Sequence, residues 1–377
     1  MATFAKTDQP LFVTTVALTV TGLVMGYSAS SVMAQLRYGS DTYFFKRQLA
    51  WVIASVLAMM VFKVMPYRRL QNAQVAFAAV GGVVILLGLA YFLDVRHRWL
   101  DFGMLHLQPA EFAKPVVALF LAYFVAHRAR AINDKHTVWP AAMAVGLVTV
   151  GVIAADLGTA VVLGITSAAV FYVAGLERRY FVALALVAVI GGAFAVVSKS
   201  YRLARVVQFF DPEYKIVRMI DHNGMFEDYL KKSVVSKDTN YQAEQSKIAV
   251  GAGGPAGLGL MRGKQKLLYL PEAHNDFIFS VICEEMGLLG SFGILAGFGV
   301  VFWRGFRAAL RTEDDFARYL ALSITIMVVA QACMNMNVAL AMAPTKGITL
   351  PMISIGGSSL LSTLVSMGIL MNITENA

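Results

Sequence analysis

The chain has 377 residues, a formal net charge of +9, and a composition that is 58% hydrophobic and only 15% charged. A soluble domain carries roughly 25% charged residues, so this composition excludes a soluble globular enzyme, a disordered chain and a fibrous protein. It predicts an all-α polytopic membrane protein. The two cysteines, Cys283 and Cys333, lie inside apolar runs, which excludes a disulfide framework.

Apolar runs recur along the chain, and each is long enough to cross or nearly cross a hydrocarbon layer of about 30 Å. They predict about ten transmembrane helices, near 11–29, 47–65, 74–93, 110–127, 138–155, 157–175, 180–198, 277–303, 317–340 and 351–372. The first run is predicted to be a retained anchor, because it is longer than the core of a cleaved signal peptide. The fifth and sixth runs are separated only near Asp156, so one long helix or a re-entrant turn is the alternative there.

The short loops predict the orientation of the chain. Lys and Arg are more numerous in the loops on the side of the N-terminus, which predicts that both termini are cytoplasmic. Because the positive charge is spread over many loops, it favours anionic head groups or a phosphate-bearing lipid over nucleic acid. The predicted organisation is helices one to seven in 1–198, a large extracytoplasmic loop in 199–275, and helices eight to ten in 276–377.

The long polar loop has two parts. Between 206 and 235, aromatic and aliphatic residues alternate with charges, which predicts one or two interfacial amphipathic helices or a small cap packed on the bundle. The glycine-rich stretch 251–259 predicts a flexible, turn-rich segment. The spacing of Gly259, Gly263 and Lys264 does not match a nucleotide-binding loop, although the nearby cations could form a basic turn for phosphate.

Asp276 ends the polar loop and opens the eighth span. It is either a helix cap or a carboxylate at the mouth of a membrane cavity, where partial desolvation would raise its pKa towards the working range of a base. Glu284 and Glu285 follow about 12 Å further along the helix, and carboxylates inside a membrane are functional candidates. At helical spacing, at most one of them shares the face of Asp276. For Glu285 we predict a structural pairing or polar contacts with a packing helix.

Other charged residues lie at the predicted outer ends of the helices. Glu111 and Lys114 are three residues apart, which predicts an ion pair, or a lysine that holds an anionic head group. Asp156 is either a turn residue or a cavity carboxylate. Arg98 and Trp99 are either an anchor at the membrane interface or part of a head-group site.

Taken in chain order, these segments resemble the SEDS family (shape, elongation, division and sporulation), which polymerises bacterial peptidoglycan. The strings YLPEAHNDFIFSVICEEMGLLG and PTKGITLPMISIGGSS carry the similarity. Their sequences are closer to the division branch of the family than to the elongation branch. The resemblance implies a ten-helix fold and a glycosyltransferase that joins lipid II units during septal cell-wall synthesis. It also implies a partner class B penicillin-binding protein, other division proteins, and a place in the bacterial cytoplasmic (inner) membrane at the septum.

The resemblance further implies that Asp276 is essential. The sequence departs from the family pattern at Asn275, where Thr is usual, at Ala154 and Ala155, which replace Gln-Pro, and in a longer stretch at 221–240. Asn275 keeps a hydrogen-bonding side chain, so the site is expected to be intact. The two alanines could alter how Asp156 is presented.

A mechanism follows as a hypothesis. Asp276 is the base that accepts the proton of the acceptor sugar hydroxyl. The residues predicted to bind the substrate and its pyrophosphate are Arg98, Lys114, Glu111, Asp156, Lys346, Arg47, Trp99 and His274. No dedicated set of metal ligands is visible, although a divalent cation, Mg²⁺ or Mn²⁺, could help to neutralise the leaving group. The alternatives are a lipid II flippase and a non-catalytic scaffold for the penicillin-binding protein.

Overall fold

The structure is a computed structural model that describes residues 7–95, 97–103, 105–128, 131–211, 214–221, 225–233, 238–345 and 347–376. It is built almost entirely from helices. In chain order they are α1 (Gln9–Tyr38), α2 (Tyr43–Val64), the 3-10 helix η1 (Tyr67–Leu70), α3 (Ala73–Leu93), α4 (Pro109–Arg128), α5 (Lys135–Ala155), α6 (Leu157–Val173), α7 (Arg178–Val197), α8 (Ser200–Phe210), α9 (Lys215–Ile220), α10 (Met225–Ser233), α11 (Asp238–Ala252), α12 (Ile278–Arg311), α13 (Asp315–Ala339) and α14 (Gly357–Asn376). Two short strands, β1 (Leu100–Phe102) and β2 (Leu105–Leu107), pair antiparallel between α3 and α4.

Within the described ranges, nine helices are long and apolar enough to cross a membrane. They correspond to nine of the predicted spans, and the tenth, 157–175, corresponds to the shorter apolar helix α6 of 17 residues, about 26 Å long. Asp156 ends α5 and begins α6, because its side chain accepts a hydrogen bond from the amide of Gly158 at 2.8 Å. The alternative of a single long helix at this point is therefore wrong.

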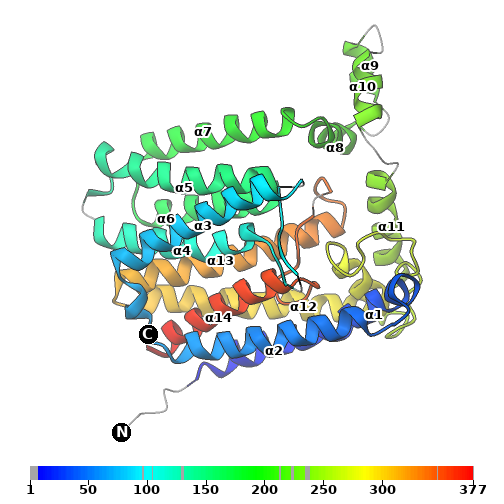
Figure 1. Cartoon of the computed structure of the whole chain (residues 1–377), viewed down its shortest axis with the longest axis horizontal. Helices are drawn as coiled ribbons and strands as arrows, with labels where there is room; N and C mark the ends of the chain where they lie inside the picture. The colour runs from blue at the N-terminus through cyan, green and yellow to red at the C-terminus, as the bar shows by residue number, and fades with distance from the viewer. Residues whose placement is uncertain are drawn as a thin grey trace.

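The long helices lie side by side in one bundle, with α13 and α14 in its interior and α7 along one edge (Figure 1). Helix α7 exposes large apolar side chains, including Ile190 and Phe194, whose exposed fractions are 67% and 73%. Exposed apolar surface of this extent suits contact with lipid chains, which are as apolar as the side chains themselves. The chain is accordingly a multi-pass membrane protein.

Both termini lie at the same end of the bundle (Figure 1). There, Lys63 Nζ lies 3.1 Å from Glu375 Oε1 and donates to Thr7 Oγ1 at 3.1 Å. Arg304 donates to Asp8 Oδ2 from two nitrogens, at 2.8 and 2.9 Å. These bonds join the ends of α1, α2, α12 and α14. The placement of both termini on one side agrees with the predicted topology, and the assignment of that side to the cytoplasm stays a prediction.

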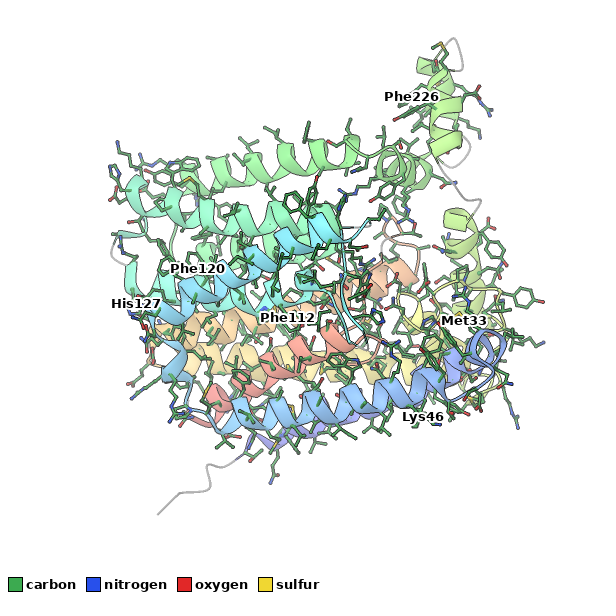
Figure 2. The ribbon with its side chains drawn as sticks, in the orientation of Figure 1. Met33, Lys46, Phe112, Phe120, His127 and Phe226 are labelled. Atoms are coloured by element: carbon green, nitrogen blue, oxygen red, sulfur yellow. The ribbon has the colours of Figure 1, made fainter. Side chains whose placement is uncertain are left out.

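The stretch 199–275 contains four helices, α8 to α11. Three of them, α8 to α10, overlap residues 206–235, where one or two were predicted. Helices α8 to α10 have a small apolar cluster of their own, formed by Ala204, Tyr214, Val217 and Leu230. Helices α9 and α10 project away from the bundle (Figure 1), and Phe226 lies on this projection (Figure 2). They form a protrusion, not a cap packed on the bundle. The division of the chain at residues 198 and 276 stays a prediction.

The last predicted span, 351–372, begins too early. The amides of Ile353 and Ser354 donate to the carbonyl of Leu350 at 3.2 and 3.0 Å, so this apolar stretch forms a turn, and α14 begins only at Gly357. A Cβ at Gly357 would lie 2.2 Å from the ring of Trp51, which is the close approach that a glycine allows. Hydropathy alone did not separate a buried turn from the start of a helix.

Candidate active site

Asp276 lies just before α12 with its backbone held from two sides. Its carbonyl accepts a hydrogen bond from Asn335 Nδ2 at 2.8 Å, and the carbonyl of Asn275 accepts one from Ser354 Oγ at 2.6 Å. The N-cap residue of α12 is Phe277, and no side-chain cap bond is made there, so the interpretation of Asp276 as a helix cap is wrong. Its Oδ1 is buried and has no hydrogen-bond partner among the described residues.

The surroundings of Asp276 favour the protonated form of its carboxyl group. The pKa is raised from 3.8 to about 7, and the largest cause is desolvation by burial. The charges of Glu272 and Asp156 also raise the pKa, whereas those of Arg98 and Arg205 lower it. A carboxyl group with this pKa is close to half ionised at neutral pH. That is the range in which a general base is both available and able to accept a proton.

A cavity of about 430 Å³ lies at the end of the bundle opposite the termini. Its polar lining includes Arg98, Asp156, Tyr201, Arg202 and Arg205. Gly347 also lines it and adjoins the catalytic candidate, because a Cβ on this glycine would lie 2.8 Å from Asp276 Oδ2. We call this space the arginine cavity. Its guanidinium groups suit an anionic ligand such as a phosphate.

Asp156 has both of the roles that the sequence left open. One carboxylate oxygen accepts from the amide of Gly158 at 2.8 Å and the other from Thr159 Oγ1 at 2.6 Å, so it caps α6. It also lines the arginine cavity.

Arg202 and Arg205 were missed in the sequence. Arg202 donates to the carbonyl of Ile153 at 2.8 Å and to that of Ala195 at 3.3 Å, and so joins α8 to α5 and α7. Arg205 donates to the carbonyl of Thr345 at 3.5 Å, a long bond that leaves most of its donors for a ligand. Their spacing of three residues on an amphipathic helix could have shown that they share a face. It could not show that α8 covers a cavity.

Arg205→Ala is expected to weaken binding of a phosphate-bearing ligand by about 10- to 100-fold, the loss of one or two charge-assisted hydrogen bonds. It should also move the acidic limb of the activity profile to higher pH, because Arg205 lowers the pKa of Asp276. Binding of a labelled pyrophosphate-bearing lipid in nanodiscs and a pH series measure the two effects. Arg178→Ala, at an exposed arginine that begins α7, is the control, and an equal loss of affinity in both variants would contradict the prediction.

A second cavity, of about 470 Å³, adjoins the β1–β2 hairpin. It is lined by Arg47 and Trp99, and by His106 and Asp101, whose side chains are hydrogen-bonded to each other. Arg98 Cζ lies 5.7 Å from the centre of the Trp99 ring, although Arg98 itself lines the arginine cavity. The neighbouring residues Arg98 and Trp99 therefore serve two different cavities.

Glu111 and Lys114 form the predicted ion pair, at 2.6 Å, deep in the bundle. Lys114 is 2% exposed, lines neither of the two cavities, and donates to Gln331 Oε1 at 2.6 Å. Gln331 Nε2 in turn donates to the carbonyl of Thr349 at 2.9 Å, close in sequence to Gly347. Through Gln331, Lys114 therefore supports the segment that contains Thr349 and Gly347 beside the arginine cavity. A direct contact of Glu111 or Lys114 with substrate stays a prediction.

His274 lies against an aromatic side chain of α2. The ring centre of His274 lies 5.4 Å from that of Phe44. Burial lowers the pKa of His274, against an opposing effect of Glu272, so its imidazole is neutral at neutral pH. Its contact with substrate stays a prediction. Lys346 lies outside the described residues.

The described residues contain no group of three or more His, Cys, Asp or Glu side chains that could hold a metal ion. The charge of Asp156 nevertheless raises the pKa of Asp276, so the two carboxyl groups lie near each other. Mg²⁺ is commonly held by one or two carboxylates together with substrate phosphates. Asp156 lines the arginine cavity and is the carboxylate available to such a site, and a divalent cation here stays a prediction.

Comparison with known proteins gives one consistent result. The model of the FtsW, RodA and SpoVE family, described as "Cell cycle protein", matches residues 9–377. The chain is 35% identical to the probable peptidoglycan glycosyltransferase FtsW of Trichlorobacter lovleyi, over 98% of this chain and 93% of that protein. It is 32% identical to the stage V sporulation protein E of Bacillus subtilis, over 98% and 97% of the two chains.

Solved structures show the same fold. A chain from a peptidoglycan synthase complex matches with a TM-score of 0.73 at 24% identity, covering 99% of each chain. The rod shape determining protein RodA of Thermus thermophilus matches with a TM-score of 0.65 at 23% identity, covering 99% of this chain and 98% of that one.

Proposed function

This chain belongs to the FtsW, RodA and SpoVE family of cell cycle proteins, and on that basis we propose that it is a peptidoglycan glycosyltransferase that polymerises lipid II into glycan strands during cell division. The observation that carries the proposal is Asp276, a buried carboxyl group with an unpartnered oxygen and a pKa of about 7. It lies beside the arginine cavity. The identity to relatives named as peptidoglycan glycosyltransferases supports the same conclusion.

In the proposed reaction, a sugar hydroxyl of the acceptor attacks the anomeric carbon of the donor. A carbon–oxygen bond forms there as the bond to the lipid pyrophosphate breaks. Asp276 accepts the hydroxyl proton, which its unpartnered Oδ1 and its pKa both favour. The fixed backbone around Asp276 keeps the carboxylate in one position throughout the reaction.

The pyrophosphate leaves with negative charge, and Arg98 and Arg205 in the arginine cavity stabilise it. A bound Mg²⁺ or Mn²⁺, held by Asp156 with the phosphates, would neutralise part of the same charge. The energy comes from cleavage of the bond between the donor sugar and its lipid pyrophosphate. No nucleotide is needed.

The setting of the enzyme is part of the proposal. We place the protein in the bacterial inner membrane at the division septum, with both termini in the cytoplasm and both cavities on the periplasmic side. A class B penicillin-binding protein is the proposed partner and supplies the transpeptidase. The peptidoglycan synthase complex of similar fold supports this arrangement.

A lipid II flippase is the rival function. A transporter holds its substrate near the midplane and opens to both sides. Here both cavities lie at the end opposite the termini, whereas the other end is tied by the Lys63–Glu375 and Asp8–Arg304 ion pairs. This asymmetry favours chemistry at one surface over transport.

Purified protein with labelled lipid II, in the presence and absence of the partner transpeptidase, tests the proposal. Glycan strands that require this chain are expected. Movement of lipid II across vesicles without polymerisation would indicate a flippase. Strands formed by the partner alone would indicate a scaffold, and either result would overturn the proposal.

The pH dependence of kcat/KM should have an acidic limb with a midpoint near pH 7, because a protonated Asp276 cannot accept the hydroxyl proton. Activity should therefore fall as the pH falls through 7. Initial rates from pH 5 to 9 measure the limb. A midpoint near the ordinary value of an aspartate, about 4, would show that another group controls the reaction.

A further inference from the structure

Helix α12 is broken at Gly287, whose backbone has φ 63° and ψ −160°. The break leaves two carbonyls and two amides without their helical partners, and the glycine-rich segment 254–259 satisfies them. The amides of Leu258 and Gly259 donate to the carbonyls of Glu284 and Glu285 at 2.9 and 3.0 Å. In return, the amide of Leu288 donates to the carbonyl of Gly254 at 2.9 Å, and that of Leu289 to the carbonyl of Pro255 at 3.3 Å. The segment predicted to be flexible is therefore bound into the helix.

The glutamate side chains at the same break hold the next part of the loop. Glu285 accepts from Lys266 Nζ at 2.6 Å and from Ser28 Oγ of α1 at 2.8 Å. Its other oxygen accepts from the amide of Met261 at 3.0 Å. The predicted structural pairing of Glu285 is confirmed. Lys266 is one of the clustered cations that could form a basic turn for phosphate, but it is buried and paired with Glu285.

Glu284 also holds the loop, by accepting hydrogen bonds from backbone amides of the loop. It accepts from the amide of Lys264 at 2.7 Å and from that of Gln265 at 3.2 Å. Glu284 and Glu285 are each 1% exposed, and Lys266 is 4% exposed. A buried ion pair seldom adds net stability compared with apolar side chains, so stability alone does not explain three buried charges here. What the charges provide is a specific geometry.

That geometry bears on the active site. The first part of α12, from Ile278 to the break, is a short helix, and Asp276 lies at one end of it while Glu285 lies at the other, about 14 Å away. The end that carries Asp276 is held by Asn335, through the bond to its carbonyl. The end that carries Glu285 is held by Lys266 and Ser28. A shift of either end along the axis would move the carboxylate of Asp276 relative to the arginine cavity.

We infer that Glu284, Glu285 and Lys266 are positioning residues that hold the short helix, and with it Asp276, in register with the arginine cavity. We call the contacts of Glu284 and Glu285 with Lys266 and the loop the clamp. The inference rests on the proposed function for its effect on catalysis, but the clamp itself is a property of the fold. It assigns a role to the intramembrane glutamates that takes them out of the chemical step.

The test compares two buried ion pairs at opposite ends of the bundle. Lys266→Met and the double variant Lys266→Met/Glu285→Gln alter the clamp, and Lys63→Met/Glu375→Gln alters a pair whose side chains are 12% and 4% exposed. Lys266→Met should lower the melting temperature and reduce kcat by about 10- to 100-fold, with KM for lipid II unchanged. The double variant should recover melting temperature, because no unpaired buried charge remains, while kcat stays low. The control double variant should keep the kcat of the wild type.

Recovery of kcat together with melting temperature in the clamp double variant would show that the pair acts through stability alone, and would overturn the inference. Hydrogen exchange gives a second readout that needs no activity. Peptides covering 261–270 should exchange faster in Lys266→Met and not in the control, and unchanged exchange would also overturn it. A wild-type protein without polymerase activity would instead refute the proposed function, and the exchange measurement would still decide the clamp.

Discussion

Asp276→Asn is expected to reduce glycan polymerisation by at least about 10²-fold, because asparagine cannot accept the hydroxyl proton that a general base removes. The variant should fold, since Asp276 Oδ1 makes no hydrogen bond within the described chain that asparagine would lose. Synthesis of strands by the purified variant, free of contaminating transferases, measures the effect. Activity close to that of the wild type would remove Asp276 from the role of base.

The same variant should be more stable than the wild type at high pH. The pKa of Asp276 is about 7 in the folded protein against 3.8 for the ordinary group, so the folded state binds the proton more tightly than the unfolded state. Ionisation of the carboxyl therefore costs stability as the pH rises between these values, and the full cost is reached above pH 7. Asparagine stays neutral. The melting temperatures should coincide near pH 4 and diverge in favour of the variant by pH 8.

That combination of lost activity and gained stability separates a catalytic carboxylate from a structural one. A carboxylate that served the fold would lower the melting temperature when replaced. An active site keeps a poorly solvated charge in spite of its cost to stability. A lower melting temperature for Asp276→Asn at pH 8 would contradict this account of the site.

Gly253→Ala is expected to destabilise the protein by about 3 kcal/mol, at the upper end of the cost of overpacking a buried position. A Cβ at Gly253 would lie 1.9 Å from the carbonyl oxygen of Cys283 in α12. That oxygen belongs to the backbone of a packed helix, so the clash cannot be relieved by turning a side chain. Separation of α11 from α12 should follow, with a fall in melting temperature of several degrees.

Gly251→Ala is the matched control, two residues earlier, near the end of α11. A Cβ there would meet nothing within 4 Å, and alanine is favoured over glycine in a helix by roughly 1 kcal/mol. Thermal unfolding of both variants in the same detergent compares them. Equal melting temperatures would show that the glycine-rich segment does not pack as closely on α12 as the structure has it.

Local patterns in the sequence located the membrane-spanning helices, except for the start of α14 and the break in α12. Hydropathy located the spans because each long helix is a continuous apolar run, and a helix satisfies its own backbone hydrogen bonds in lipid. The spacing of Glu111 and Lys114 was enough for their ion pair, since residues three apart in a helix share a face. Asp276 was singled out as a candidate because it is an acidic residue where a polar loop enters the membrane, and the family resemblance implied that it is essential.

The tertiary structure decided what surrounds Asp276. Arg205 reaches the site because α8 folds back over the ends of α5 and α7, and nothing in the composition of α8 encodes where it docks. The glycine-rich segment reads as flexible by itself, but the break at Gly287 offers it unpaired carbonyls and amides, and it becomes ordered by bonding to them. Helix formation depends on neighbours in sequence. A cavity, and the pKa of the carboxylate beside it, depend on groups far apart in the chain whose positions only the packing of the bundle determines.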